Sequence, residues 1–185
     1  SALRILTGFV LAVTVGLLLG ACGARWRWFG TLVGPVMQLI RAMPVASFVI
    51  LALLWVSGKN LSVIVSFTHV LPVVYAGTVG GIADTDPALL EMAKVYRLPL
   101  GKRLRYIWLP GMFPSFCENC IAAMGMCWKS GVSAEVIGLP DHSVGDALYR
   151  AKITISTPEV FAWTLVIVLL SATLSTLAAW ALRRA

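Results

Sequence analysis

The sequence has little charge of either sign. Only 12% of its 185 residues are Asp, Glu, Lys or Arg, whereas a soluble globular domain carries about 25%. Apolar residues make up 59% of the chain, and the mean hydropathy is +0.88. This composition excludes an ordinary water-surrounded domain and predicts a chain that lies in a lipid bilayer.

Two further absences argue against nucleotide hydrolysis and nucleic-acid binding. The nearest approach to a phosphate-binding loop is Gly101-Lys102, but Tyr96 stands where the loop needs its first glycine. Arg103 follows where the loop needs Ser or Thr. The net charge of +7 is not gathered into a basic stripe with interleaved aromatic residues. We expect no catalytic residue, no cofactor and no nucleic-acid partner.

Cysteine is also scarce, with four residues. Cys117 and Cys120 have CxxC spacing, which on a helix places both thiols on one face and allows a metal or redox role. No second pair and no nearby His completes a tetrahedral ligand set. The alternative is that both residues pack as small apolar side chains between helices. The sequence favours packing and predicts no metal site.

Five apolar segments approach or exceed the roughly 20 residues that a membrane-spanning helix needs. They are residues 3–21, 31–57, 61–83, 111–139 and 160–182. We predict an all-α membrane protein with five transmembrane helices in one domain, residues 1–185. A cytoplasmic loop of about residues 84–110 and an outer loop of about residues 139–158 connect the last three helices. The first segment is interpreted as a span because no basic start or cleavage site accompanies it.

The distribution of Lys and Arg predicts the orientation. Five spans place the two termini on opposite sides of the membrane. If the C-terminus is cytoplasmic, nine Lys and Arg residues lie on that side and four on the other. We therefore expect the N-terminus outside and the C-terminus in the cytoplasm.

The stretch between the third and fourth predicted spans is the most charged part of the chain. Its charged residues are Glu91, Lys94, Arg97, Lys102, Arg103 and Arg105. Asp86-Pro87 is a helix start signal, because Asp caps free amides and Pro fits the first turn. Leu98-Pro99 ends that helix. We predict one helix over residues 87–96 and a second over residues 100–108, ending at Leu109-Pro110.

This stretch resembles the coupling loop of binding-protein-dependent ABC importer permeases. Their pattern is Glu-Ala-Ala, three residues, Gly, nine residues and Ile-x-Leu-Pro. Glu91-Met92-Ala93 matches its start, Arg97 stands at the Gly, and Ile107-Trp108-Leu109-Pro110 falls at the expected distance. The resemblance implies coupling to a separate ATPase subunit. The residues that it assigns to coupling are Glu91, Ala93, Arg97, Ile107, Leu109 and Pro110.

The resemblance extends over nearly the whole chain. Residues 2–20, 39–58 and 128–151 look like segments of nitrate, sulfonate and taurine type permeases. This implies the type I ABC importer permease fold in the bacterial inner membrane. The implied partners are two ATPase subunits, a second permease subunit in a homodimer, an extracytoplasmic solute-binding protein and membrane lipid. The implied solute is a small organic compound of the sulfonate, nitrate and taurine type, for which an anion is one option, or a vitamin precursor.

Ionisable side chains inside spans are costly and usually face a cavity or a partner. Arg41, Lys129 and Glu135 are candidates for lining the translocation path, where the two basic residues would favour an anion. Alternatively, one of the two pairs with Glu135 or a helix-end carbonyl and holds the bundle together. His69 is interpreted as a packing residue. Pro44, also a path candidate, and Pro72 mark points where a span can bend.

Small residues offer close-packing faces for helix association. Gly8, Gly16 and Gly20 and the Ser/Thr-rich last span are candidates for packing in the dimer.

Three alternatives compete with this prediction. The charged stretch alone could be a basic loop that binds anionic lipid. The whole chain could be an ATP-independent channel or secondary transporter, for which inverted repeats or paired broken helices are expected. It could also be a membrane scaffold that transports nothing. The Glu-x-Ala and Leu-Pro spacing favours the ATP-driven permease.

Overall fold

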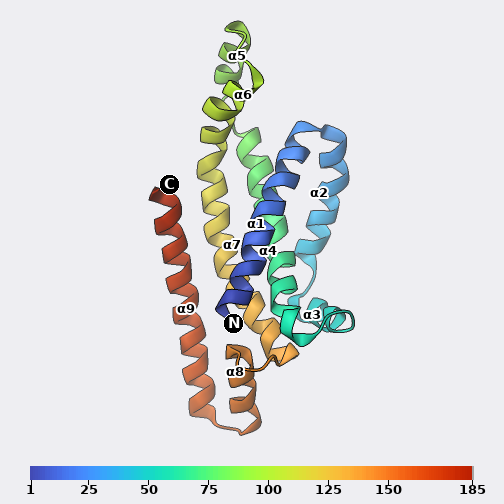
Figure 1. The fold of residues 1–185 in the computed structure, drawn as a ribbon, viewed down its shortest axis with the longest axis vertical. Helices are drawn as coiled ribbons and strands as arrows, with labels where there is room; N and C mark the ends of the chain where they lie inside the picture. Colours follow the sequence, from blue (N-terminus) through green and yellow to red (C-terminus); the bar gives the residue numbers. More distant parts are fainter. Residues whose placement is uncertain (185) are drawn as a thin grey trace.

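The computed structural model describes residues 1–184, and within them all regular secondary structure is helical (Figure 1). In chain order the helices are α1 (Ala2–Arg25), α2 (Arg27–Ala42), α3 (Val45–Leu53), α4 (Gly58–Ala83), α5 (Pro87–Val95), α6 (Leu100–Arg103), the π-helical turn η1 (Leu104–Trp108), α7 (Leu109–Gly138), α8 (Val144–Ile153) and α9 (Thr157–Arg184). The predicted all-α class is confirmed.

Three of the described helices, α1, α4 and α9, are long and apolar enough to cross a membrane. The number becomes four if the bent pair α2–α3 counts as one span. α7 is long enough with 30 residues, but the charged Glu118, Lys129 and Glu135 lower its hydropathy. The predicted count of five spans is therefore not confirmed and stays a prediction.

Pro44 divides the second predicted span. α2 and α3 meet at 97°, and Met43 between them has extended backbone, with φ −70° and ψ 130°. Proline has no amide hydrogen, and its ring disfavours helical backbone at the preceding residue. Residues 31–57 thus belong to two helices, of which α3 lies across the end of the bundle (Figure 1).

α1 packs against α4 through its glycines. A Cβ on Gly8 would lie 2.5 Å from the carbonyl oxygen of Val63, and one on Gly20 would lie 2.6 Å from the Thr78 Cβ. A Cβ on Gly16 would lie 3.0 Å from the side chain of Val74. There is room for the hydrogen atom of glycine at these three positions but not for a methyl group. The three glycines predicted to pack in a dimer therefore pack inside the chain.

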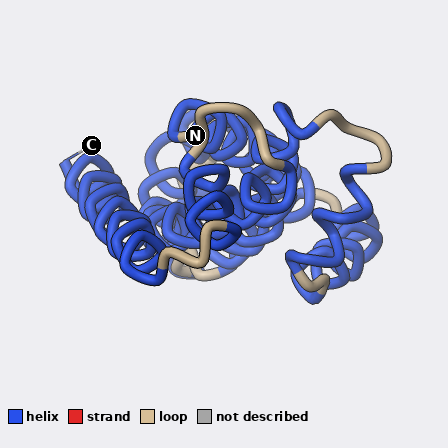
Figure 2. Tube along the Cα trace, turned by 90° about the horizontal axis from the view of Figure 1, so that it is seen from below, coloured by secondary structure: helices blue, strands red, loops and turns tan. Residues whose placement is uncertain are grey.

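α9 stands at one edge of the bundle and packs against α7 and α8 (Figure 2). Trp128 of α7 is 2% exposed, and its indole Nε1–H donates to the carbonyl of Ile167 at 3.1 Å. The thiol of Cys117 approaches the carbonyl of Leu182 at 3.9 Å. Cys117 and Cys120 are both buried and not disulfide-bonded, so packing accounts for their place in this part of the bundle.

Candidate functional site

Asp86 starts the charged segment, residues 87–108, as a helix. Its Oδ1 accepts a hydrogen bond from the Ala88 amide at 2.8 Å, and Pro87 occupies the first turn. Such a cap contributes about 1 kcal/mol to helix stability. α5 therefore begins where the sequence predicts it.

A left-handed residue ends α5. Arg97 has φ 49°, and the amides of Arg97 and Leu98 bond to the carbonyls of Lys94 at 3.1 Å and Ala93 at 3.0 Å. These two bonds form a Schellman motif, in which glycine is the usual left-handed residue. The permease pattern has Gly at this position. Arg97 keeps the geometry of the turn and adds strain to it, because a Cβ costs about 1–2 kcal/mol in left-handed backbone.

Replacing Arg97 by glycine is expected to stabilise this turn by about 1 kcal/mol, because it removes the left-handed strain. Hydrogen–deuterium exchange of the α5 amides should become slower. Ile155 has φ 54° and holds the equivalent position after α8, so Ile155→Gly should slow exchange in α8 likewise. Unchanged exchange in both variants would contradict the strain argument.

The second helix of the segment differs from the prediction. It does not end at Leu109-Pro110 but continues without a break through α6, η1 and α7. In an ordinary α-helix the Pro110 ring would clash with the carbonyl four residues earlier. In η1 the Leu109 amide bonds to the Leu104 carbonyl instead, and this wider turn accommodates the proline. One helical rod therefore joins the charged segment to the membrane part.

The predicted coupling residues divide into two groups. Glu91, Arg97, Leu109 and Pro110 are exposed, whereas Ala93 is 0% and Ile107 is 5% exposed. Arg103 of α6 donates to the carbonyl of Ala93 at 3.3 Å and so ties α6 to α5. The exposed residues are available to a partner, and the buried ones hold the segment in shape.

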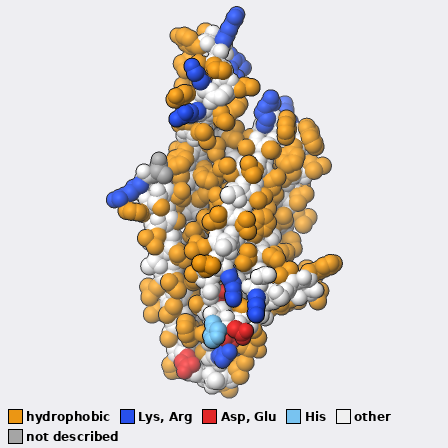
Figure 3. All heavy atoms as spheres, viewed as in Figure 1, with side chains coloured by type: hydrophobic (Ala, Val, Ile, Leu, Met, Phe, Trp, Pro, Cys, Tyr) orange, Lys and Arg blue, Asp and Glu red, His pale blue; other side chains and the backbone are white. Residues whose placement is uncertain are grey.

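The charged segment projects beyond the ends of α1 and α2 (Figure 1). Its large exposed apolar residues are Leu89, Met92, Val95, Tyr96, Leu100, Leu104 and Tyr106. Figure 3 shows apolar and basic side chains mixed at this end of the molecule. A protruding surface of this kind is typical of a protein docking site.

A stripe of exposed residues runs along α7. Glu118, Ala122, Met126, Lys129 and Ser133 are exposed at spacings of four, four, three and four residues, which is one face of a helix. Among the described residues neither charge of the stripe belongs to a salt bridge. Glu118 was not among the sequence-based candidates, although its spacing of eleven residues from Lys129, three helical turns, was the available signal.

The α7 stripe points away from α1. Cys127 and Gly131 both contact Ile5 of α1, and Lys129 lies two residues from each of them. Two residues turn an α-helix by about 200°. Lys129 and the stripe it belongs to therefore occupy the side of α7 opposite α1.

α4 also exposes a residue on its side opposite α1. Val74 and Thr78 meet the glycines of α1, and the exposed Ala76 lies two residues from each. α4 and α7 touch where a Cβ on Gly77 would meet Asn119, so the two exposed sides adjoin.

Arg41 lies at the edge of this surface. Arg41 and Gln38 of α2 line a crevice of about 360 Å³ together with Pro72 and Ala76 of α4. We call the α7 stripe, Ala76 and these two α2 residues the polar face. By contrast, the side of the molecule in Figure 3 is mostly apolar between its two ends, apart from a basic group at its left edge.

His69 and Pro72 lie on α4 near this crevice. The His69 Nδ1 is 3.0 Å from the Val65 carbonyl, and its ring packs edge-on against Phe48 of α3. These contacts agree with the packing role predicted for His69. Pro72 lies inside α4, which remains one helix.

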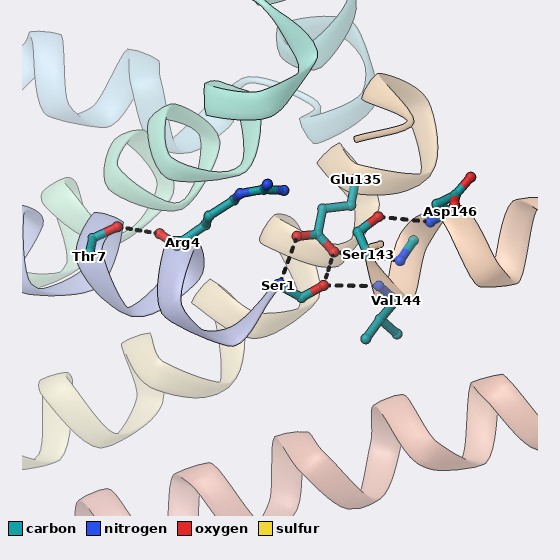
Figure 4. Close-up of polar contacts among 8 residues, drawn as sticks. Ser1, Arg4, Thr7, Glu135, Ser143, Val144 and Asp146 are labelled. Atoms are coloured by element: carbon teal, nitrogen blue, oxygen red, sulfur yellow. Dashed lines mark hydrogen bonds and ion pairs between the residues drawn. The ribbon is translucent and has the colours of Figure 1, made fainter. Parts of the chain in front are cut away.

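Glu135 lies off the polar face, in a buried contact (Figure 4). It is 1% exposed. Its Oε2 accepts hydrogen bonds from the Ser1 hydroxyl at 2.6 Å and the Gly145 amide at 3.5 Å. The Ser1 hydroxyl accepts from the Val144 amide at 2.9 Å. The carboxylate thus ties α1 and α7 to the start of α8, where the helix dipole favours a negative charge.

Three comparisons with known proteins bear on this arrangement. The sequence profile of the family described as "Binding-protein-dependent transport system inner membrane component" matches residues 12–184. A Bacillus subtilis permease named for the transport of aliphatic sulfonates is 26% identical to this chain. The matched region covers 88% of this chain and 59% of the permease. The nitrate import permease protein of Synechococcus elongatus is 25% identical over 80% of this chain and 53% of its own length.

A solved structure shares the fold. The crystal structure of an amino acid ABC transporter with histidines has a TM-score of 0.67 and 20% identity, covering 100% of this chain and 91% of that chain. The chain spans somewhat more than half the length of the two named permeases. The profile match over residues 12–184 confirms the resemblance first seen in the coupling pattern. The chain belongs to the family of inner membrane components of binding-protein-dependent transport systems.

Proposed function

We propose that this chain is the permease subunit of an ATP-driven importer, which forms part of the solute path and is moved by a separate ATPase bound to the charged segment. The observation that carries the proposal is the unbroken helical rod of α6, η1 and α7. One end of the rod lies in the protruding segment, and its longer part bears the stripe of the polar face. A partner that shifts the segment therefore acts on the helix beside the path. ATP hydrolysis belongs to the partner.

A second copy of the chain would complete the path. Charged side chains exposed at the level of the membrane are unstable against lipid. Two copies related by a twofold axis can turn their polar faces toward each other and enclose Arg41 and Lys129. Each copy then offers one charged segment, so the homodimer binds two ATPase subunits.

The proposed orientation places the charged segment and the C-terminus in the cytoplasm and the N-terminus outside a bacterial inner membrane. α8 and residues 139–158 lie at the opposite end from the charged segment (Figure 1). An extracytoplasmic solute-binding protein would deliver the solute there. This orientation places nine Lys and Arg residues on the cytoplasmic side and four on the outer side, and an excess on the cytoplasmic side supports it.

The proposed solute is a small anion. Arg41 and Lys129 bring positive charge to the polar face, and among the described residues neither is in a salt bridge. Relatives are named for aliphatic sulfonates, nitrate and bicarbonate transport, and all three solutes are anions. This supports a sulfonate- or nitrate-like anion over an uncharged vitamin precursor or a zwitterion such as taurine.

Co-purification tests the function. Extracted in mild detergent from its native membrane, the chain is expected to carry an ATPase in equal amount, and the reconstituted complex should take up solute only with ATP. A lone oligomer with an intact charged segment would contradict the proposal and favour an ATP-independent channel.

A further inference from the structure

We infer that the charge along the solute path changes sign in one step. Lys129 makes the outer half of the path attractive to anions, and Glu118 makes the inner half unfavourable to them. Glu118 then promotes release of an anionic solute toward the cytoplasm. The inference rests on the proposed function, because it requires the polar face to line the path.

The two charges share one face of one helix. Glu118 and Lys129 are eleven residues apart, which is about 20° from three full helical turns and about 16 Å along the axis. Both side chains are exposed. Neither has an ionic partner among the described residues, so no opposite charge among them offsets either side chain.

The helices packed on α7 give the depth of each charge. Asn119, next to Glu118, meets Gly77 of α4, while Thr78 beside Gly77 meets Gly20 of α1. Glu118 therefore lies near the end of α1 that faces the charged segment. At the other end, Gly131, two residues beyond Lys129, meets Ile5 of α1. Lys129 thus lies toward the outer end of the bundle.

A twofold dimer reinforces the step. An axis along the membrane normal keeps equivalent residues at equal depth, so the two Lys129 side chains share one level and the two Glu118 side chains share another. Opposite charges from the two copies do not meet and cancel. Arg41 adds to the positive part, because Gly30 of α2 meets Gly23 near the end of α1 that faces the charged segment, and Arg41 lies eleven residues, about 16 Å, farther along α2.

The step acts on affinity at each side. Positive charge along a water-filled cleft raises the local concentration of anions. A carboxylate near the inner mouth lowers the affinity of the inward-open path for the same anion, so solute leaves more readily and cytoplasmic solute rebinds less. ATP hydrolysis sets the direction of transport, and Glu118 keeps the anion from staying bound at the inner mouth of the path.

Charged thiol reagents measure the step without knowledge of the solute. Ala122 lies one turn after Glu118 and Ser133 one turn after Lys129, both exposed on the stripe. Single Ala122→Cys and Ser133→Cys chains, with their ATPase in lipid nanodiscs, are reacted with a cationic and an anionic methanethiosulfonate. Adducts are counted by peptide mass spectrometry, which separates them from the native cysteines Cys22, Cys117, Cys120 and Cys127.

The cationic reagent should react faster at Ala122→Cys and the anionic reagent faster at Ser133→Cys. A unit charge one turn away changes each rate by about tenfold in a partly hydrated path. Adding Glu118→Gln should remove the cation preference at the first position and leave the second unchanged. Lys129→Gln should do the converse.

Other outcomes separate the two proposals. Equal preference at both positions, or no effect of Glu118→Gln, would overturn the stepped path while the water-lined face stands. No reaction of either charged reagent at either position would show that the polar face is not water-lined, and that would overturn the proposed path itself.

Discussion

A single methyl group added at Gly8 is expected to destabilise the bundle by about 3 kcal/mol, the upper part of the usual range for overpacking. The new Cβ would lie 2.5 Å from the Val63 carbonyl oxygen and 3.0 Å from the Ser66 Cβ, both on α4. A carbonyl inside a helix cannot turn aside, so α1 as a whole must move away. The Gly8→Ala chain, purified in detergent, should unfold at a lower temperature by tryptophan fluorescence.

Gly34→Ala is the matched control. It adds the same methyl group to α2, where nothing lies within 4 Å of the new Cβ. Alanine is the better helix former by about 1 kcal/mol, so this chain should unfold at the same temperature as the unsubstituted one, or higher. Equal unfolding temperatures for both variants would show that α1 does not pack on α4 in the described way.

Reversing the charge of Glu91 is expected to abolish ATP-dependent uptake and leave the fold intact. Glu91 is the one acidic residue among residues 87–117, and it is exposed beside the apolar Met92 and Val95. Loss of a partnered charge in an interface costs about 2–5 kcal/mol, which corresponds to roughly thirtyfold weaker ATPase binding or more. An exposed substitution changes the free energy of unfolding by only about 0.5 kcal/mol. ATPase retained on the purified Glu91→Arg chain and uptake into proteoliposomes are the two measurements.

Asp141→Arg makes the same change of charge at the other end of the molecule, where Asp141 is also exposed. This chain should keep its ATPase. If the Glu91→Arg chain also kept the ATPase and its uptake, Glu91 would have no part in docking.

Local chemistry made the charged segment predictable. The start of α5 depends on Asp86 and Pro87 alone, and its end on Leu98 and Pro99 nearby, so short sequence windows contain the necessary information. The predicted helix end at Pro110 was wrong, because a short sequence window does not contain the information that decides it. Proline normally ends a helix, and here the wider turn of η1 lets the helix continue past Pro110. No residue type in the sequence signals that turn.

The polar face was only partly predictable. Charged residues in apolar segments stand out in any sequence, which identified Arg41, Lys129 and Glu135. Whether such a residue faces outward or inward depends on which helices pack around it. Glu135 is enclosed because Ser1 and the start of α8 meet it, and the contact with Ser1 joins opposite ends of the sequence. The glycines of α1 gave the same difficulty, since their spacing shows a close contact but not the helix that makes it.

The continuous helix from Leu100 to Gly138 is about 58 Å long at 1.5 Å per residue and ends in two different surroundings. One end belongs to the charged segment, and Glu135 near the other end holds the start of α8. In the proposed importer, a docking event at the α8 end that favours one tilt of this helix would change the affinity of the charged segment for the ATPase. Thermodynamic reciprocity would then require the ATPase to change the affinity of the α8 end by the same factor.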